Sequence, residues 1–198
     1  MHELFIKISS NFTATIDIEK IESVLHPIYT SGPNVVCDSS GKPHWQVFES
    51  NIAFSRNFYK NFKDDCLGVA YALHDLKDEL QTTDHTSKLI DTFLNHDIQP
   101  ERVGLIMTYP AKIVNPHVDR TRDICINIGL ANSNTATTYV SHGIVSEKEF
   151  WKTDIDNFTM DDGSVYIMDV KNTHAVKSNL HGNDLRIRYI ITYNMLNR

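Results

Sequence analysis

The second half of the chain is a series of short, β-prone segments separated by turns. After residue 102 the β-branched and aromatic residues gather into runs that we predict to be strands, at 103–109, 113–119, 124–130, 137–140, 164–170, 174–177 and 186–193. Turn-forming sequences such as Asn132-Ser133-Asn134 and Asp161-Asp162-Gly163 separate them. Strands this short and this closely spaced predict a barrel or a jelly roll.

The first half has a different pattern, with apolar residues at helical spacing. Cys66, Val69, Leu73, Leu76 and Leu80 recur every three or four residues, which predicts an amphipathic helix over 63–81. The same reasoning predicts further elements in this half: a strand at 3–8, a helix at 17–26 capped by Asp17, a loop at 29–44, and a helix at 86–96 beginning near Asp84 or Thr86.

Helices followed by strands predict an α+β, mainly β fold, in which helices support the outside of a β core. The length of 198 residues fits one domain. We expect residues 1–102 to be an N-terminal helical and irregular elaboration and 103–198 to be the core. The segment 141–160 is weakly patterned, and we expect either a lid over a site or a packing loop.

Charge and cysteine content narrow the possible partners and the compartment. The net charge of -6 and the absence of a Lys/Arg run argue against nucleic acid or an anionic membrane as partner. Three cysteines, Cys37, Cys66 and Cys125, without a C-x-x-C spacing indicate reduced, mostly buried thiols. The N-terminus lacks the pattern of a signal peptide, and no apolar run approaches the roughly 18 residues of a membrane span. We therefore expect a cytoplasmic protein.

The segment Asn115-Pro116-His117-Val118-Asp119 supplies candidate metal ligands. Side chains alternate along a strand, so His117 and Asp119 should point to one face. His174, on a later strand, is the candidate third ligand, and two His plus one carboxylate form the non-haem Fe(II) oxygenase arrangement. About one H-x-[DE] match is expected by chance. The alternatives are a surface His–Asp pair at a strand end for His117 and Asp119, and for His174 a core or turn histidine that hydrogen-bonds to backbone.

Two arginines open the final predicted strand. Arg186 and Arg188 should share a face of a strand that is otherwise apolar, where an unpaired charge would be costly. Guanidinium groups match carboxylates bidentately, so a bound dicarboxylic acid is a natural partner. The alternative is an edge strand whose arginines face solvent or pair with Asp184 and Asp169.

The order of these features resembles the 2-oxoglutarate/Fe(II)-dependent dioxygenases. The resemblance spans roughly residues 103–195 and rests on His117, Asp119, His174 and Arg186. Within that superfamily the sequence looks most like the aspartyl/asparaginyl β-hydroxylase-like and prolyl-hydroxylase-like branches. The interval from His174 to Arg186 is slightly long for the hydroxylase branch, which leaves Arg188 as a substitute.

The resemblance implies a double-stranded β-helix core, of the jelly-roll or cupin-like type, that holds Fe(II) through His117, Asp119 and His174. It implies 2-oxoglutarate as cosubstrate, with its far carboxylate on Arg186, and dioxygen as oxidant. Further hydrogen bonds would come from the following residues: Tyr109, Asn127 and Arg188. The products would be succinate, CO2 and a hydroxylated amino acid, peptide side chain or small metabolite, with ascorbate as a supporting reductant.

The carboxylate ligand narrows the implied reaction. Related halogenases lack it, so the presence of Asp119 favours hydroxylation. Two other functions fit the same β core: a cupin-like metalloenzyme that needs no 2-oxoglutarate, and a non-catalytic β-barrel that binds an anionic ligand.

Overall fold

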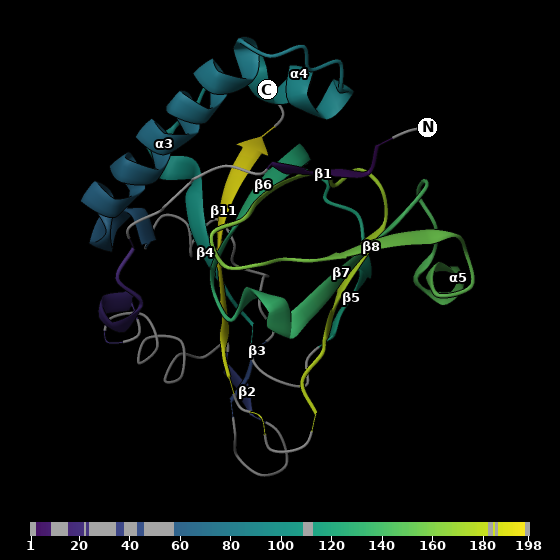
Figure 1. The fold of residues 1–198 in the computed structure, drawn as a ribbon. Coiled ribbons are helices and arrows are strands. Elements are labelled where there is room, and N and C mark those ends of the chain that lie inside the picture. Colours follow the sequence, from purple (N-terminus) through teal and green to yellow (C-terminus); the bar gives the residue numbers. More distant parts are fainter. Residues whose placement is uncertain are drawn as a thin grey trace.

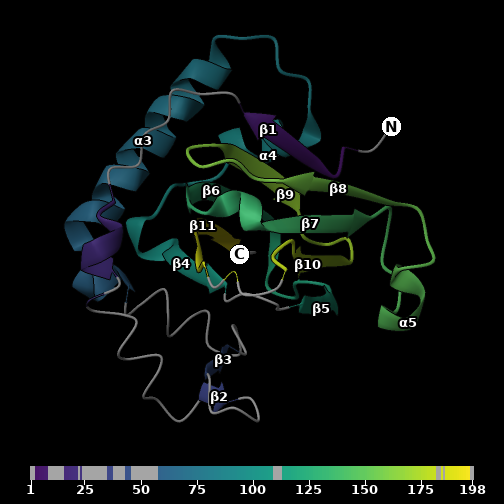
Figure 2. The ribbon, with the colours of Figure 1, turned by 60° about the horizontal axis from the view of Figure 1, so that its bottom comes forward.

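The computed structural model describes residues 3–8, 16–21, 23, 35–37, 43–45, 58–108, 113–181, 184 and 186–196. Two antiparallel sheets dominate it and face each other (Figures 1 and 2). The larger sheet has the order β1-β9-β6-β11-β4, with bounds Phe5–Ile8, Val165–Asp169, Arg122–Ala131, Arg188–Leu196 and Val103–Thr108. The smaller has the order β5-β10-β7-β8, with bounds Ile113–His117, His174–Ser178, Ala136–Ser141 and Ile155–Thr159. The predicted mainly β, double-stranded β-helix class is confirmed.

Helices cover the outer face of the larger sheet. The main helix α3 spans Lys63–Gln81, as predicted, and α4 spans Lys88–Leu94. Ser87, rather than Asp84 or Thr86, caps α4 by accepting a hydrogen bond from the Leu89 amide at 3.2 Å. Figure 1 shows both helices on the side of the larger sheet that faces away from β5, β7 and β8.

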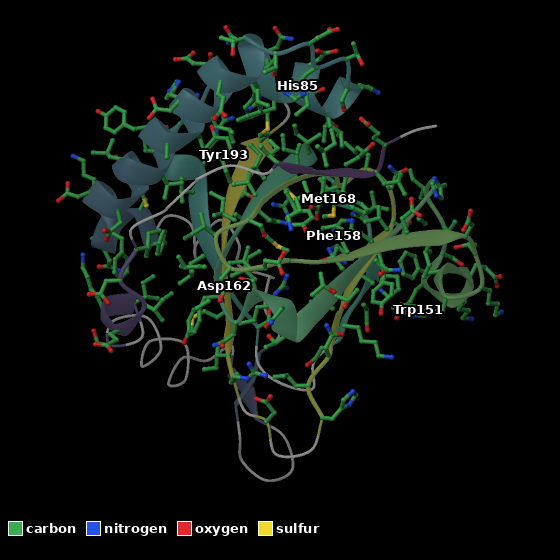
Figure 3. All side chains as sticks on the ribbon, in the orientation of Figure 1. His85, Trp151, Phe158, Asp162, Met168 and Tyr193 are labelled. Atoms are coloured by element: carbon green, nitrogen blue, oxygen red, sulfur yellow. The ribbon has the colours of Figure 1, made fainter. Side chains whose placement is uncertain are left out.

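Strand alternation sorts the side chains of the larger sheet into two cores. On β11, Tyr189, Ile191 and Tyr193 belong to the core shared with the helices, while Ile190 belongs to the core between the sheets. Figure 3 shows Tyr193 beneath the helices and Met168 and Phe158 between the sheets. The inner core consists of Leu4, Cys125, Val140, Phe158, Met160, Tyr166, Met168, Val170 and Ile190.

Of the other predictions for the first half of the chain, some are confirmed and some are wrong. Asp17 caps a helical turn by accepting the Lys20 amide at 3.1 Å, while residues 22 and 24–26 of that predicted helix lie outside the described residues. The predicted loop at 29–44 contains paired strands instead, β2 (Val35–Cys37) and β3 (Pro43–Trp45). Cys66 and Cys125 are buried free thiols, as predicted. None of the described helices is long and apolar enough to span a membrane.

The segment 141–160 packs on the smaller sheet, with β8 at one edge and the short helix α5 (Glu147–Phe150) against β5 at the other (Figure 2). Strand β8 pairs with β7. Phe150 is fully buried, and Trp151 stacks edge-on against Tyr139 at a centroid distance of 5.2 Å. These contacts support the packing alternative over the lid. Strand β8 was missed because its sequence, Ile155–Thr159, is mostly polar.

Candidate metal centre

A β-bulge turns His117 toward the space between the sheets. In the pairing of β5 with β10, His117 lies opposite His174 and Val114 opposite Val176, so β5 carries one extra residue at 115–116. Bulges re-aim side chains beside functional sites, and Pro116, which has no amide N–H, suits such a position. As a result Val114 and His117, three positions apart, both line the same cavity.

Three candidate ligands converge at this point. His117 Nε2 lies 3.8 Å from Asp119 Oδ1, and His174 Nε2 lies 3.9 Å from Asp119 Oδ2. All three ligand atoms fall within 4.8 Å of one another. The two His–Asp distances exceed hydrogen-bond length. They are within reach of one shared ion, because two metal–ligand bonds of about 2.1 Å each span up to about 4.2 Å.

Backbone contacts fix the orientation of both imidazoles. His117 Nδ1 lies 2.7 Å from the Asn115 carbonyl oxygen, and His174 Nδ1 lies 3.0 Å from that of Asn172. A carbonyl only accepts, so in each neutral ring Nδ1 carries the proton and the Nε2 lone pair faces Asp119. Burial, with the neighbouring His117, lowers the pKa of His174 to about 4, so that ring is neutral near pH 7. This donor set fits a divalent transition metal.

The strand β5 ends at His117, so Asp119 lies just beyond it. The Asp119 amide donates to the Val170 carbonyl at 3.1 Å, which ties this residue to the end of β9. The Asp119 carboxylate accepts a hydrogen bond from Arg122 Nε at 2.6 Å. Sequence reasoning missed Arg122, although its place three residues after Asp119 was visible.

The candidate ligands share one cavity with the inner faces of both sheets. Its volume is about 200 Å³. Besides the three ligands, its lining consists of Ile106, Thr108, Val114, Arg122, Cys125, Asn127, Thr138, Met168, Val176, Arg188 and Ile190. A small polar ligand could therefore contact the metal position and several hydrogen-bonding side chains at once.

The two candidate arginines, Arg186 and Arg188, lie in different surroundings. Arg188 is 3% exposed, lines the cavity, and donates from Nε to the Ser133 carbonyl at 3.2 Å. Burial lowers its pKa to about 9, and within the described part of the chain no carboxylate pairs with it. Arg186 is exposed and donates from Nη2 to Asp184 Oδ2 at 2.8 Å. The expected shared strand face does not form, because β11 begins only at Arg188.

The remaining candidates lie as follows. Asn127 lines the cavity, and its Oδ1 is buried without a hydrogen-bond partner among the described residues. Tyr109 lies outside the described residues. Thr108, which sequence reasoning missed, faces Arg188 directly across the β4–β11 pairing and also lines the cavity. Only the strand register reveals this neighbour.

No protein-family model matches this sequence, and no curated protein does. Solved structures do match. AviO1 from Streptomyces viridochromogenes Tue57 is similar with a TM-score of 0.58 and 15% identity, over 98% of this chain and 90% of that one. This likeness shows a shared fold along nearly the whole chain.

Two partial matches have lower scores. A Pseudomonas putida prolyl-4-hydroxylase gives a TM-score of 0.36 at 9% identity, over 65% of this chain and 81% of that one. The non-haem α-ketoglutarate-dependent epimerase SnoN gives 0.34 at 12% identity, over 46% of this chain and 45% of that one.

Proposed function

We propose that this protein is an Fe(II)- and 2-oxoglutarate-dependent oxygenase that hydroxylates a C–H bond of an amino acid, a peptide side chain or a small metabolite. One observation carries the proposal. His117, Asp119 and His174 converge on the same cavity in which Arg188 is buried. Bound Fe(II) supplies the activation of dioxygen: one oxygen atom enters the C–H bond, and the other oxidises 2-oxoglutarate to succinate and CO2.

The protein's part at the metal is to hold the ion on one side. Two neutral imidazoles and one carboxylate bring a single negative charge to a divalent cation. The Nδ1 contacts of His117 and His174 with backbone carbonyls keep their Nε2 atoms directed at the ion. Because these ligands would hold the ion from one side, room would remain on its other side for the cosubstrate and dioxygen.

Arg188 is the proposed partner of the far carboxylate of 2-oxoglutarate. A buried guanidinium that pairs with no carboxylate of the described residues gains from an anionic ligand, through both charge and paired N–H donors. The Thr108 hydroxyl, on the neighbouring strand, can donate to the same carboxylate. The cavity of about 200 Å³ lies below the about 300–1,000 Å³ of typical drug-sized sites, which suits a small dicarboxylate.

The proposal is tested by measuring succinate release from 2-oxoglutarate with Fe(II) and ascorbate. We expect His174→Ala to abolish release, because a buried ligand is lost. His74→Ala is the matched control, since His74 is exposed on α3 and should leave release unchanged. Turnover without the primary substrate is slow in uncoupled reactions, so Fe(II) binding is measured on the same samples. Equal release and equal metal binding in the wild type and His174→Ala would refute the proposal.

A further inference from the structure

A second β-bulge, at the start of β6, turns Arg122 into the cavity. In the pairing of β6 with β11, Met195 lies opposite Ile124 and Leu196 opposite Arg122, so residue 123 is extra. Regular alternation would send Arg122 to the same face as Ile124, which belongs to the core shared with the helices. Arg122 instead lines the cavity of the candidate ligands.

In the cavity, Arg122 connects Asp119 to strand β11 of the larger sheet. Its Nε donates to Asp119 Oδ2 at 2.6 Å, and its Nη1 donates to the Asn194 side-chain oxygen on β11. The side chains of Arg122 and Asp119 are only 13% and 16% exposed, so water screens this pair little. A short charge-assisted hydrogen bond in such surroundings restricts the rotation of the carboxylate.

We infer that Arg122 is a positioning residue that makes Asp119 bind the metal through one oxygen. Oδ2, which lies 3.9 Å from His174 Nε2, already accepts the Arg122 hydrogen bond, so Oδ1, 3.8 Å from His117 Nε2, is the oxygen that we expect to bind the ion. A carboxylate bound through both oxygens would occupy a coordination position that the keto acid or dioxygen needs. The chain Asn194–Arg122–Asp119 therefore keeps that position open. This inference rests on the proposed function of the same site.

A purely structural role makes a different prediction. If Arg122 only neutralised a buried carboxylate, its replacement would lower stability but, in folded protein, would leave metal affinity equal or higher, because a neighbouring positive charge would be gone. If Arg122 positions Asp119, loss of its hydrogen bond weakens metal binding even in folded protein. Replacement of residues that orient a metal ligand typically costs about 10–100-fold in affinity.

The experiment is an anaerobic titration with Co(II), which reports both affinity and, through its visible absorption, coordination number. We expect Arg122→Met to bind Co(II) about 10–100-fold more weakly with an altered spectrum. Arg122→Gln keeps an N–H donor without the charge and should recover part of the affinity. Arg120→Met is the matched control: Arg120 is exposed in the same segment, and the variant should match the wild type.

Arg122→Gln serves as the test variant if Arg122→Met does not fold. If folded Arg122→Met and Arg122→Gln bind Co(II) as tightly as the wild type, or tighter, with an unchanged spectrum, the positioning role is overturned. If His174→Ala also binds like the wild type, the metal site itself is wrong, and the proposed function fails with it. If His174→Ala loses Co(II) binding while the Arg122 variants keep it, the proposed function stands and only the positioning role of Arg122 is rejected.

Discussion

At the scale of single residues, the cavity differs from an ordinary protein interior because it buries a cation. Arg188 contributes its guanidinium at 3% exposure, and its Nε bond goes to a backbone carbonyl, which cannot neutralise it. Arg186, two positions earlier, has a carboxylate partner in Asp184. This contrast separates a ligand-binding role from a surface role.

The first prediction compares these two arginines. Arg188→Met should weaken the binding of 2-oxoglutarate to the metal-loaded protein by about tenfold or more, since hydrogen bonds to charged groups contribute about 1.5–3 kcal/mol. Arg186→Met should bind as the wild type does, because Arg186 lies outside the cavity. Equilibrium dialysis of labelled 2-oxoglutarate under anaerobic conditions measures both. If Arg186→Met weakened 2-oxoglutarate binding and Arg188→Met did not, the far carboxylate of 2-oxoglutarate would be assigned to Arg186.

The second prediction concerns pH and the metal-free protein. Burial lowers the pKa of His174 to about 4, below its usual value of about 6.5 in the unfolded chain. Between these values the unfolded chain binds a proton that the folded protein excludes. The free energy of unfolding should therefore fall as pH drops from 6.5 to 4, by up to about 1.4 kcal/mol per pH unit from this group. Urea unfolding in the presence of a chelator measures the slope.

The control for this pH dependence is His174→Gln, which removes the titrating ring. Its free energy of unfolding should vary less with pH over the same interval. An identical slope in both proteins would mean that His174 is not buried in its neutral form.

At the scale of elements, the strands were predictable and their irregularities were not. Alternation and turn residues locate strands such as β4 and β9 to within a residue or two, because those signals are local. A bulge depends on which residue faces which across a pairing, and pairing is non-local. The bulges at 115–116 and 123 therefore escaped prediction, and with the second one the role of Arg122.

The site residues show the same division. His117, Asp119 and His174 could be selected from residue type and order, and the structure brings them together. Arg188 could be separated from Arg186 only by the position at which β11 begins. Thr108 became visible only through its pairing with Arg188, and such a neighbour leaves no mark in the sequence around it.

A third prediction belongs to this scale. Gly129, on β6, has no room for a side chain: a Cβ there would clash with the backbone oxygen of Asp161. Backbone cannot swing away, so Gly129→Ala should lower the free energy of unfolding by about 3 kcal/mol. Gly68→Ala on helix α3 is the contrast, because outside the helix's own backbone no atom of the described residues lies within 4 Å of the added Cβ. That change should raise stability by about 0.5–1 kcal/mol.

Urea unfolding of both glycine variants provides the measurement. Equal midpoints for Gly129→Ala and the wild type would show that β6 and the turn at Asp161 do not approach as closely as the structure has them.

At the scale of the whole molecule, the two faces of the larger sheet have different roles. The outer face of the larger sheet packs against α3 and α4 and provides the main hydrophobic core. That packing leaves the space between the sheets available for polar side chains, and seven strands from both sheets contribute to the cavity: β4, β5, β6, β7, β9, β10 and β11. Residues far apart in the chain thereby meet in a site that no local segment could form.

The proposed function requires this cavity to hold a metal and a dicarboxylate together. Anaerobic calorimetric titration of 2-oxoglutarate into the protein, once with Fe(II) and once with a chelator, tests it most directly. We predict one equivalent bound with Fe(II) and affinity at least about tenfold lower without it, a difference of about 1.4 kcal/mol or more. No binding with Fe(II) would favour a cupin-like enzyme without this cosubstrate. Equal binding with the chelator would indicate a non-catalytic barrel for anions, and either result would contradict the account.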